Sequence, residues 1–211
     1  MPPLKSILCI VLLGILALAP IRPASANLLQ NGSFETGPDP GPFIELPLNS
    51  TAITGWTVTR DPIDYVGTFW DASEGSRSID LHRSHLPTPG AGGIAQTFAT
   101  QPGSPYKVTF DMAGNFEAGE VVKDMRVTAA GESTDYSFDV TGRSANDMGW
   151  VSRNFMFDAV GIMTTLEFFS LDPVSTGGPA LDNVTVTLIP EPGMVVMMMI
   201  GIAGMIKRPL R

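Results

Sequence analysis

The sequence predicts an all-β fold, a β-sandwich or jelly roll, on three observations. Hydrophobic and polar residues alternate with a period of two, most clearly in PYKVTFDMAG at 105–114 and NVTVTL at 183–188. The 22 glycines and 18 prolines separate short runs of such residues. No segment between 27 and 189 has the apolar spacing of an amphipathic helix. Many short strands joined by glycine- and proline-rich turns are typical of a sandwich or jelly roll.

The expected strands follow one another along the chain, and each is bounded by turn residues. RSIDLH and IAQTF are short and end at glycine or proline, whereas VSRNFMF and TTLEFF are rich in β-branched and aromatic residues. The ten expected strands lie near 56–59, 63–67, 77–82, 94–98, 105–113, 123–130, 133–140, 150–157, 164–170 and 181–188. No internal repeat is visible, which argues against a propeller or a solenoid.

Residues 1–26 have the layout of a secretory signal peptide. Lys5 supplies the positive charge, an apolar run extends from Ile7 to Ala19, and an Ala-Ser-Ala sequence ends the segment. We therefore expect cleavage between Ala26 and Asn27. The alternative is an uncleaved anchor, although the 13 apolar residues are short for a membrane span.

Cysteine content and charge agree with an exported body. The single cysteine, Cys9, lies in the predicted signal peptide, so the mature chain has no disulfide and depends on its core, or on a bound metal, for stability. The net charge is −8, and no acidic residue precedes Glu35 or follows Glu191. An acidic body repels nucleic acid, so we expect no nucleic-acid partner.

Residues 190–211 contain three parts in order. Pro190, Glu191 and Pro192 come first, an apolar run follows at 193–206, and a basic cluster ends the chain. A helix of 14 residues covers about 21 Å, less than the roughly 30 Å of a hydrocarbon core. The pattern resembles the PEP-CTERM sorting signal of Gram-negative bacteria.

That resemblance implies a processing partner and a location. Exosortase, a membrane protease-transpeptidase, recognises and processes this signal, so the protein would contact the membrane through 193–206 only transiently. The processed protein would then reach the cell surface or the extracellular matrix. The alternative is a permanent anchor whose basic end lies in the cytoplasm.

The body between the two ends, 27–189, resembles a second family. The matching segments are NLLQNGSFETG at 27–37, GWTV at 55–58, IDYVGTFW at 63–70, SEGSRSIDL at 73–81, GGIAQTFATQPGSPYKVTFDMAGN at 92–115, MGWVSRNFMFDA at 148–159 and GGPALDNVTV at 177–186. They look like the choice-of-anchor C family and its plant cell-wall relatives, domain-of-unknown-function family 642. The resemblance implies a galactose-binding-like jelly roll of carbohydrate-binding type whose opening strand lies in 27–37. HRSHLP at 82–87 stands where the family has a shorter turn.

Three carboxylates form a candidate calcium site. Glu35 follows Phe34 in the expected first strand, Asp182 begins the last strand, and Glu74 precedes a glycine turn. First and last strands commonly meet in a jelly roll, and calcium prefers carboxylate and carbonyl oxygens. Related carbohydrate-binding modules hold a structural calcium with matching terminal acids, which implies the same for Glu35 and Asp182. The alternative is that these acids cap strands or pair with Arg77.

Loop aromatics form a candidate glycan site. Trp70 and Phe116 lie in glycine-bounded loops, with Asp71 and Asn115 beside them. An exposed ring stacks on a sugar while nearby polar groups bind its hydroxyls. The alternative is that the tryptophans pack in the core.

No motif for catalysis is present. His82 and His85 lack further metal ligands, no G-x-S-x-G sequence occurs, and we expect ordinary surface histidines. We therefore expect a non-enzymatic surface or biofilm-matrix protein that binds exopolysaccharide or cell-wall glycan. The rivals are an adhesive matrix protein without a sugar ligand and a hydrolase with an unrecognised carboxylate pair, since carboxylate separation is a spatial quantity.

Overall fold

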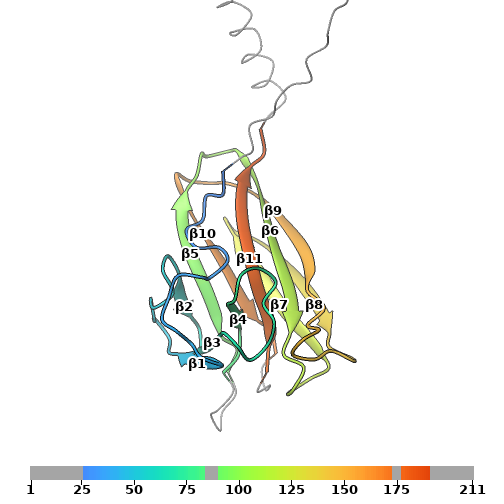
Figure 1. Ribbon diagram of the computed structural model, residues 1–211. Helices are drawn as coiled ribbons and strands as arrows, with labels where there is room; N and C mark the ends of the chain where they lie inside the picture. Colours follow the sequence, from blue (N-terminus) through green and yellow to red (C-terminus); the bar gives the residue numbers. More distant parts are fainter. Residues whose placement is uncertain (1–25, 84–89, 173–176, 191–211) are drawn as a thin grey trace, which may run out of the picture.

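The computed structural model describes residues 26–83, 90–172 and 177–190, and there the chain forms a sandwich of two antiparallel sheets (Figure 1). The strands are β1 (Phe43–Leu46), β2 (Thr57–Thr59), β3 (Ile63–Val66), β4 (Ser78–Asp80), β5 (Gly93–Ala99), β6 (Pro105–Gly114), β7 (Val122–Ala129), β8 (Glu132–Asp139), β9 (Val151–Asp158), β10 (Met163–Ser170) and β11 (Pro179–Leu188). The predicted all-β, jelly-roll sandwich is confirmed. No helix in the described ranges is long and apolar enough to span a bilayer.

Strands that follow one another in the sequence often belong to different sheets. The six-stranded sheet has the order β1-β3-β4-β11-β6-β9, and the five-stranded sheet has the order β2-β5-β10-β7-β8. From β5 onward the chain crosses repeatedly between the sheets, so strands that are neighbours in space come from distant parts of the sequence. The last strand, β11, lies in the middle of its sheet between β4 and β6.

The core lies between the sheets and follows the predicted alternation. In β6, Tyr106, Val108, Phe110 and Met112 are buried, while the residues between them are partly or fully exposed. Phe110 meets Phe168 of the opposite sheet edge to face, with 5.1 Å between ring centroids. Period-two burial on both sheets therefore makes one continuous core.

Two local predictions were wrong. Residues 27–37 form turns and bends in place of an opening strand, although Leu28 N–H donates to the Val186 carbonyl. Gly32 lets this segment approach β11 closely, since a Cβ there would lie 1.9 Å from the Val184 carbonyl oxygen. The edge strand β1 was not expected, because FIEL is short and stands between two prolines.

The sandwich has two ends that differ in what they hold. Both described chain ends lie at one end, where Asn27 Oδ1 accepts from Val186 N–H and Ile189 N–H donates to the Pro105 carbonyl (Figure 1). We call this end the chain-end pole. It consists of residues 26–29, 100–104, 130–131, 159–162 and 189–190. The opposite end holds the described connecting residues 60–62, 81–83, 90–92, 115–121, 140–150, 171–172 and 177–178.

Candidate functional site

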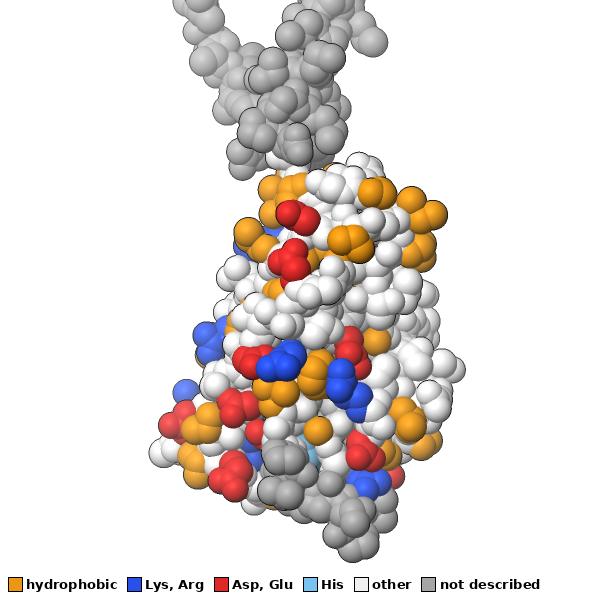
Figure 2. All heavy atoms as spheres, turned by 180° about the vertical axis from the view of Figure 1, so that it is seen from behind, with side chains coloured by type: hydrophobic (Ala, Val, Ile, Leu, Met, Phe, Trp, Pro, Cys, Tyr) orange, Lys and Arg blue, Asp and Glu red, His pale blue; other side chains and the backbone are white. Residues whose placement is uncertain are grey.

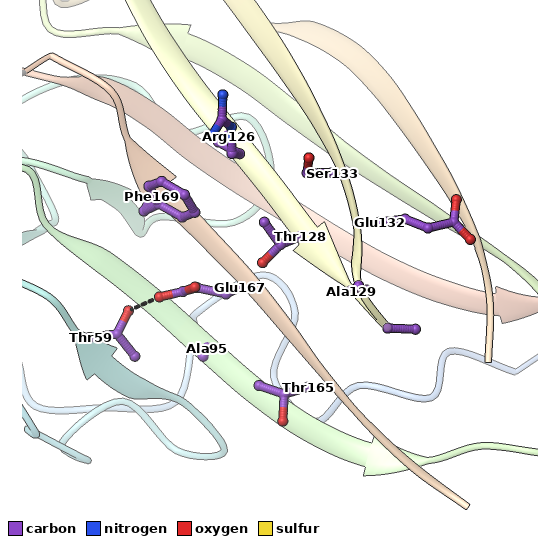
Figure 3. A pocket seen from close by; sticks show the side chains of 12 residues that line it. Thr59, Ala95, Arg126, Thr128, Ala129, Glu132, Ser133, Thr165, Glu167 and Phe169 are labelled. Atoms are coloured by element: carbon purple, nitrogen blue, oxygen red, sulfur yellow. Dashed lines mark hydrogen bonds between the residues drawn. The ribbon is translucent and has the colours of Figure 1, made fainter. Parts of the chain in front are cut away.

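A hollow of about 610 Å³ opens on the outer face of the five-stranded sheet (Figure 3). All five strands of the sheet contribute to it, together with the turn between β7 and β8. Its lining includes Thr59, Ala95, Arg126, Thr128, Glu132, Ser133, Thr165, Glu167 and Phe169. We call it the sheet hollow.

The strand register arranges this face in two rows that cross the whole sheet. One row is Thr57, Ala95, Glu167, Thr128 and Ser133, and the next is Thr59, Gly93, Phe169, Arg126 and Asp135. Neighbouring strands lie about 4.8 Å apart, so each row spans about 19 Å. Because Gly93 and Ala95 have no side chain or a small one, the outer face of the sheet is lower at β5 than at the neighbouring strands. The sheet hollow therefore has the shape of an open, extended site.

The charged side chains on this face are paired with one another. The Arg60 guanidinium binds Glu167 through two hydrogen bonds of 3.0 Å, and Thr59 Oγ1 donates to the same carboxylate at 2.8 Å. Arg126 likewise binds Asp135 at 2.5 and 2.7 Å. The hydrogen bond from Arg126 lowers the pKa of Asp135, which keeps this carboxylate ionised. Fixed pairs leave little net charge to attract an anionic ligand.

Hydroxyl groups and one covered aromatic ring make up the rest of the sheet hollow. Thr128, Thr165 and Ser133 present hydroxyls from three neighbouring strands (Figure 3). The Arg60 guanidinium carbon lies 3.4 Å from the centroid of the Phe169 ring, a cation–π contact that makes a flat surface. Figure 2 shows acidic and basic side chains facing each other around hydrophobic ones on this side of the molecule. Such a face can hydrogen-bond a polar, uncharged ligand.

Trp70 does not form the stacking platform that the sequence predicted. Only 4% of its surface is exposed, and its indole Nε1 donates to Ser78 Oγ at 2.8 Å. A ring held in the core has no face to offer a sugar, so this prediction is corrected. Asp71 is exposed, and its carbonyl accepts from Trp150 Nε1 at 2.9 Å.

Asn115 and Phe116, the other two predicted ligand-binding residues, differ in their exposure. Asn115 is buried, donates through Nδ2 to Asp80 Oδ2 at 2.9 Å and accepts from Glu117 N–H at 3.0 Å, so its amide faces the interior. Phe116 is partly exposed and stacks on Phe69 with 6.5 Å between ring centroids. The structure therefore brings the two loop aromatics together, but Asn115 does not face outward beside them.

Glu35 and Asp182 hold one loop, 73–77, from two sides. Glu35 Oε1 accepts from the backbone N–H groups of Ser76 and Arg77 at 2.9 and 2.8 Å. Its other oxygen accepts from Ser76 Oγ at 2.9 Å. Glu35 therefore caps the turn before β4, as the alternative interpretation expected.

Asp182 is fully buried and also accepts backbone hydrogen bonds. Its Oδ2 accepts from the N–H groups of Ser73 and Glu74 at 2.8 and 2.9 Å. Burial raises the pKa of this carboxyl to about 7, and the charge of Asp111 across the strand pair adds to the effect. The Glu74 side chain itself is exposed.

The oxygen atoms around Glu35 are engaged by hydrogen-bond donors. Arg77 Nη1 donates to the carbonyls of Glu35 and Gly37 and to the Tyr65 hydroxyl, at 2.9, 3.1 and 3.0 Å. The carbonyl oxygens thus face a guanidinium, and the carboxylates face N–H donors. Within 26–83, 90–172 and 177–190 no three acidic, histidine or cysteine side chains gather as a metal site. Calcium binding by Glu35, Glu74 and Asp182 stays a prediction.

A buried polar cluster lies near the end opposite the chain ends. His82 is fully buried, and its Nε2 lies 2.6 Å from the Asp172 carbonyl, so the expectation of a surface histidine was wrong. An antiparallel β-bridge between His82 and Ala91 holds the backbone of His82 in this position. The Lys123 ammonium donates to the carbonyls of Ala118 and Gly177, and burial lowers the pKa of Lys123. These bonds fix two loops. His85 lies outside the described residues.

Fold and face together define a β-sandwich domain with a hydroxyl-rich hollow on one sheet. The chain belongs to the family described as protein of unknown function DUF642, whose profile matches residues 27–187. This confirms the resemblance of the body to family 642. Pro190 is exposed at the chain-end pole, whereas Glu191 and Pro192 of the predicted sorting motif lie outside the described residues.

Two curated relatives are much longer than this chain. Halomucin of Haloquadratum walsbyi is 31% identical over 88% of the chain, which spans 2% of that protein. The Arabidopsis thaliana protein DUF642 L-galactono-1,4-lactone-responsive gene 2 is 28% identical over 83% of the chain, which spans half of it.

Similar chains among solved structures include carbohydrate-binding modules and a glycoside hydrolase. TmCBM61, solved with β-1,4-galactotriose, has a TM-score of 0.45 and 14% identity over 78% of this chain and 100% of its own. The xylan-binding domain CBM22-1 of Paenibacillus barcinonensis Xyn10C has a TM-score of 0.43 and 15% identity, over 70% and 94%. The arabinose-bound α-L-arabinofuranosidase MgGH51 has a TM-score of 0.49 and 11% identity, over 78% and 26%. These likenesses concern the fold alone.

The sheet hollow was not found from the sequence. Its residues stand at outward positions of five strands whose order only the tertiary structure provides. A usable signal did exist, since Thr128 and Thr165 are hydroxyl-bearing residues on outward positions of two expected strands. Without the register of the strands, the sequence does not show that these two residues lie on the same face of one sheet.

Proposed function

We propose that the sheet hollow binds an uncharged polysaccharide, such as an exopolysaccharide or a neutral cell-wall glycan, and that the domain acts by binding and not by catalysis. The observation that supports this most directly is the pairing of charges around a hydroxyl-lined hollow. Sugar hydroxyls exchange hydrogen bonds with threonine, serine and paired carboxylate groups without needing a net charge.

The dimensions and the openness of this face favour a polysaccharide over a single sugar as the ligand. Ligand sites commonly have volumes of about 300–1,000 Å³. The sheet hollow has about 610 Å³ and is crossed by rows that run over five strands. A polymer would lie along the face and contact several residues at once, which suits the binding of an extended glycan.

A bulky substitution in the lining of the sheet hollow tests this proposal. Thr165 is exposed, so Thr165→Trp adds a large ring without removing a core contact. In affinity electrophoresis through gels that contain neutral galactan, xylan or glucan, we expect retardation of the unmodified protein. We expect the variant to lose binding by at least about tenfold, or 1.4 kcal/mol.

The matched control is Ser152→Trp, which places the same ring on the outer face of the other sheet. It should keep the affinity of the unmodified protein. Equal retardation of Thr165→Trp and the unmodified protein would reject the sheet hollow as the site. No retardation in any neutral glycan gel would favour the adhesive matrix protein without a sugar ligand.

The two acids of the sheet hollow do not favour hydrolysis. Both oxygens of Glu167 already accept hydrogen bonds from Arg60 and Thr59, so this carboxyl group is engaged by protein donors and is not free to act on a glycosidic bond. Glu132 accepts from Asp158 N–H at the rim. Release of reducing ends from a bound glycan, abolished by Glu167→Gln, would replace this proposal with a hydrolase.

We also propose that the chain is exported, cut after Ala26, and sorted by an exosortase to the surface or matrix of a Gram-negative bacterium. The support comes from the signal-like segment 1–26 and the three-part pattern at 190–211. Asn27 and Pro190 are both exposed, which agrees with access for processing enzymes. Intact mass of the protein from cells with and without exosortase tests this. A product that still ends at Arg211 in exosortase-containing cells would reject it.

A further inference from the structure

The two ends of the sandwich differ sharply in charge. None of the described residues of the chain-end pole, at 26–29, 100–104, 130–131, 159–162 and 189–190, is charged. The connections at the opposite end carry Arg60, Asp61, Arg83, Glu117, Glu120, Arg143, Asp147 and Asp172. In a chain with a net charge of −8, the described residues of the pole carry no charge themselves, and the acidic residues Glu132 and Asp158 flank it.

Exposed hydrophobic side chains gather at the same pole. The described chain has nine large hydrophobic residues that are exposed, and five of them lie at or next to the chain-end pole: Leu28, Met156, Val160, Ile162 and Met163. Val160 and Ile162, at the tip of the β9–β10 connection, are 79% and 74% exposed. Figure 2 shows hydrophobic side chains at this end of the body, with acidic side chains between them. Such a concentration marks an interaction surface.

The tip is held firmly in its projecting position. Thr100 donates through its backbone N–H to the Ile162 carbonyl at 2.9 Å and through Oγ1 to the Gly161 carbonyl at 2.8 Å. Gly103 N–H donates to the Ala159 carbonyl at 2.7 Å. Because the neighbouring loop already orders the tip, little conformational entropy is lost when its side chains enter an apolar phase.

We infer that the chain-end pole docks on the interface of a lipid bilayer, with Val160 and Ile162 inserted. The described chain ends at Pro190 on this same pole, and the sequence continues into the apolar run 193–206. The exposed side chains of Val160 and Ile162 lie at the same pole at which the described chain ends, before the apolar run in the sequence. Both can therefore contact the apolar region of the same bilayer. Glu132 and Asp158 lie just beyond the pole, so the surface suits neutral, zwitterionic headgroups better than anionic ones.

Docking in this way would orient the domain. The charged end would point away from the membrane, and the sheet hollow, on the side of the sandwich, would be held next to the lipid surface with its long rows exposed. The inference does not depend on the proposed glycan ligand, because it rests on the chain-end pole alone.

Site-specific fluorescence on the full chain tests the inference. Cys9→Ser makes an introduced cysteine unique, and Val160→Cys and Ile162→Cys place it at side chains so exposed that folding is undisturbed. Thr141→Cys, on an exposed loop residue at the opposite end, is the matched control. Each variant carries an environment-sensitive dye and is measured before and after phosphatidylcholine vesicles are added.

We expect the dyes at 160 and 162 to shift to shorter wavelength on adding vesicles and to be quenched by lipid-bound nitroxide. The dye at 141 should stay quenched by iodide in water. If all three positions behave like 141, the body is merely tethered and the inference is overturned. It is also overturned if 160 and 162 are already shielded without vesicles, because a second copy or the chain itself then covers the pole.

Discussion

Replacing Asp80 with asparagine should flatten the dependence of stability on pH. The carboxyl group of Asp80 is buried and accepts from the N–H groups of His82 and Gly178 and from Asn115 Nδ2. Burial raises its pKa from 3.8 to about 7, and the neighbouring Asp64 adds to the rise. The ionised form is therefore disfavoured in the folded protein relative to the unfolded chain.

The sign and the magnitude follow from that pKa. Below 3.8 the group is protonated in both states, and its contribution to stability is fully present. Between 3.8 and about 7 the folded state holds the proton more tightly, so stability falls as the pH rises. Three pKa units correspond to at most about 4 kcal/mol, lost by about pH 8. Asparagine cannot ionise, so Asp80→Asn removes this loss.

Urea unfolding followed by tryptophan fluorescence, at intervals from pH 4 to 8, measures the effect. The free energy of unfolding of Asp80→Asn minus that of the unmodified protein should grow by a few kcal/mol across this range. Turning the Asn115 amide to face the new side chain adds a constant offset that does not change with pH.

The control is Asp139→Asn. Hydrogen bonds from Thr141 lower the pKa of the exposed Asp139, so its contribution has the opposite sign and is lost as the pH falls. Parallel pH profiles for Asp80→Asn and the unmodified protein would refute the reasoning, because they would mean that Asp80 ionises in the folded protein as it does in the unfolded chain.

Three further substitutions test other contacts. Trp70→Ala should lower the free energy of unfolding by about 3–5 kcal/mol in a urea titration, because it removes a buried ring. Glycan binding per folded molecule, measured by affinity electrophoresis, should stay unchanged. Lost binding with unchanged stability would restore Trp70 as a ligand platform. Gly32→Ala should destabilise by about 1–3 kcal/mol in the same titration, since its Cβ would collide with the Val184 carbonyl, and an unchanged midpoint would contradict that close approach. Glu35→Ala should lower the melting temperature equally with calcium and with chelator; a calcium-dependent gain that only the unmodified protein shows would establish the predicted metal site.

The fold was predictable because strand periodicity is a local property. Alternation in PYKVTFDMAG fixes which side chains of β6 face the core, and the structure places Tyr106 and Val108 inward as expected. The edge strand β1 was not predicted because the four residues between Pro42 and Pro47 are too few to show a periodicity. The segment 27–37 was wrongly expected as a strand because close packing on β11, and not alternation, decides its path.

The candidate sites show the limit of local patterns. The sequence placed Trp70 and Phe116 together in a candidate glycan site, yet it could not tell that Trp70 is buried and donates from its indole to Ser78. Glu35 and Asp182 both accept hydrogen bonds from the loop 73–77, but the sequence could not show the direction of those N–H groups or of Arg77. Whether a carboxylate faces a metal or a donor depends on neighbours far away in the chain.

Composition and periodicity by themselves determined that this is an acidic, disulfide-free body of antiparallel strands, because charge, cysteine position and alternation are written in consecutive residues. Only the tertiary structure decided which strands are neighbours. That order aligns Thr59, Phe169 and Arg126 in one row, removes Asp80 from water and collects Val160 with the chain ends at one uncharged pole. These properties arise from contacts between residues distant in sequence, which no window of consecutive residues contains.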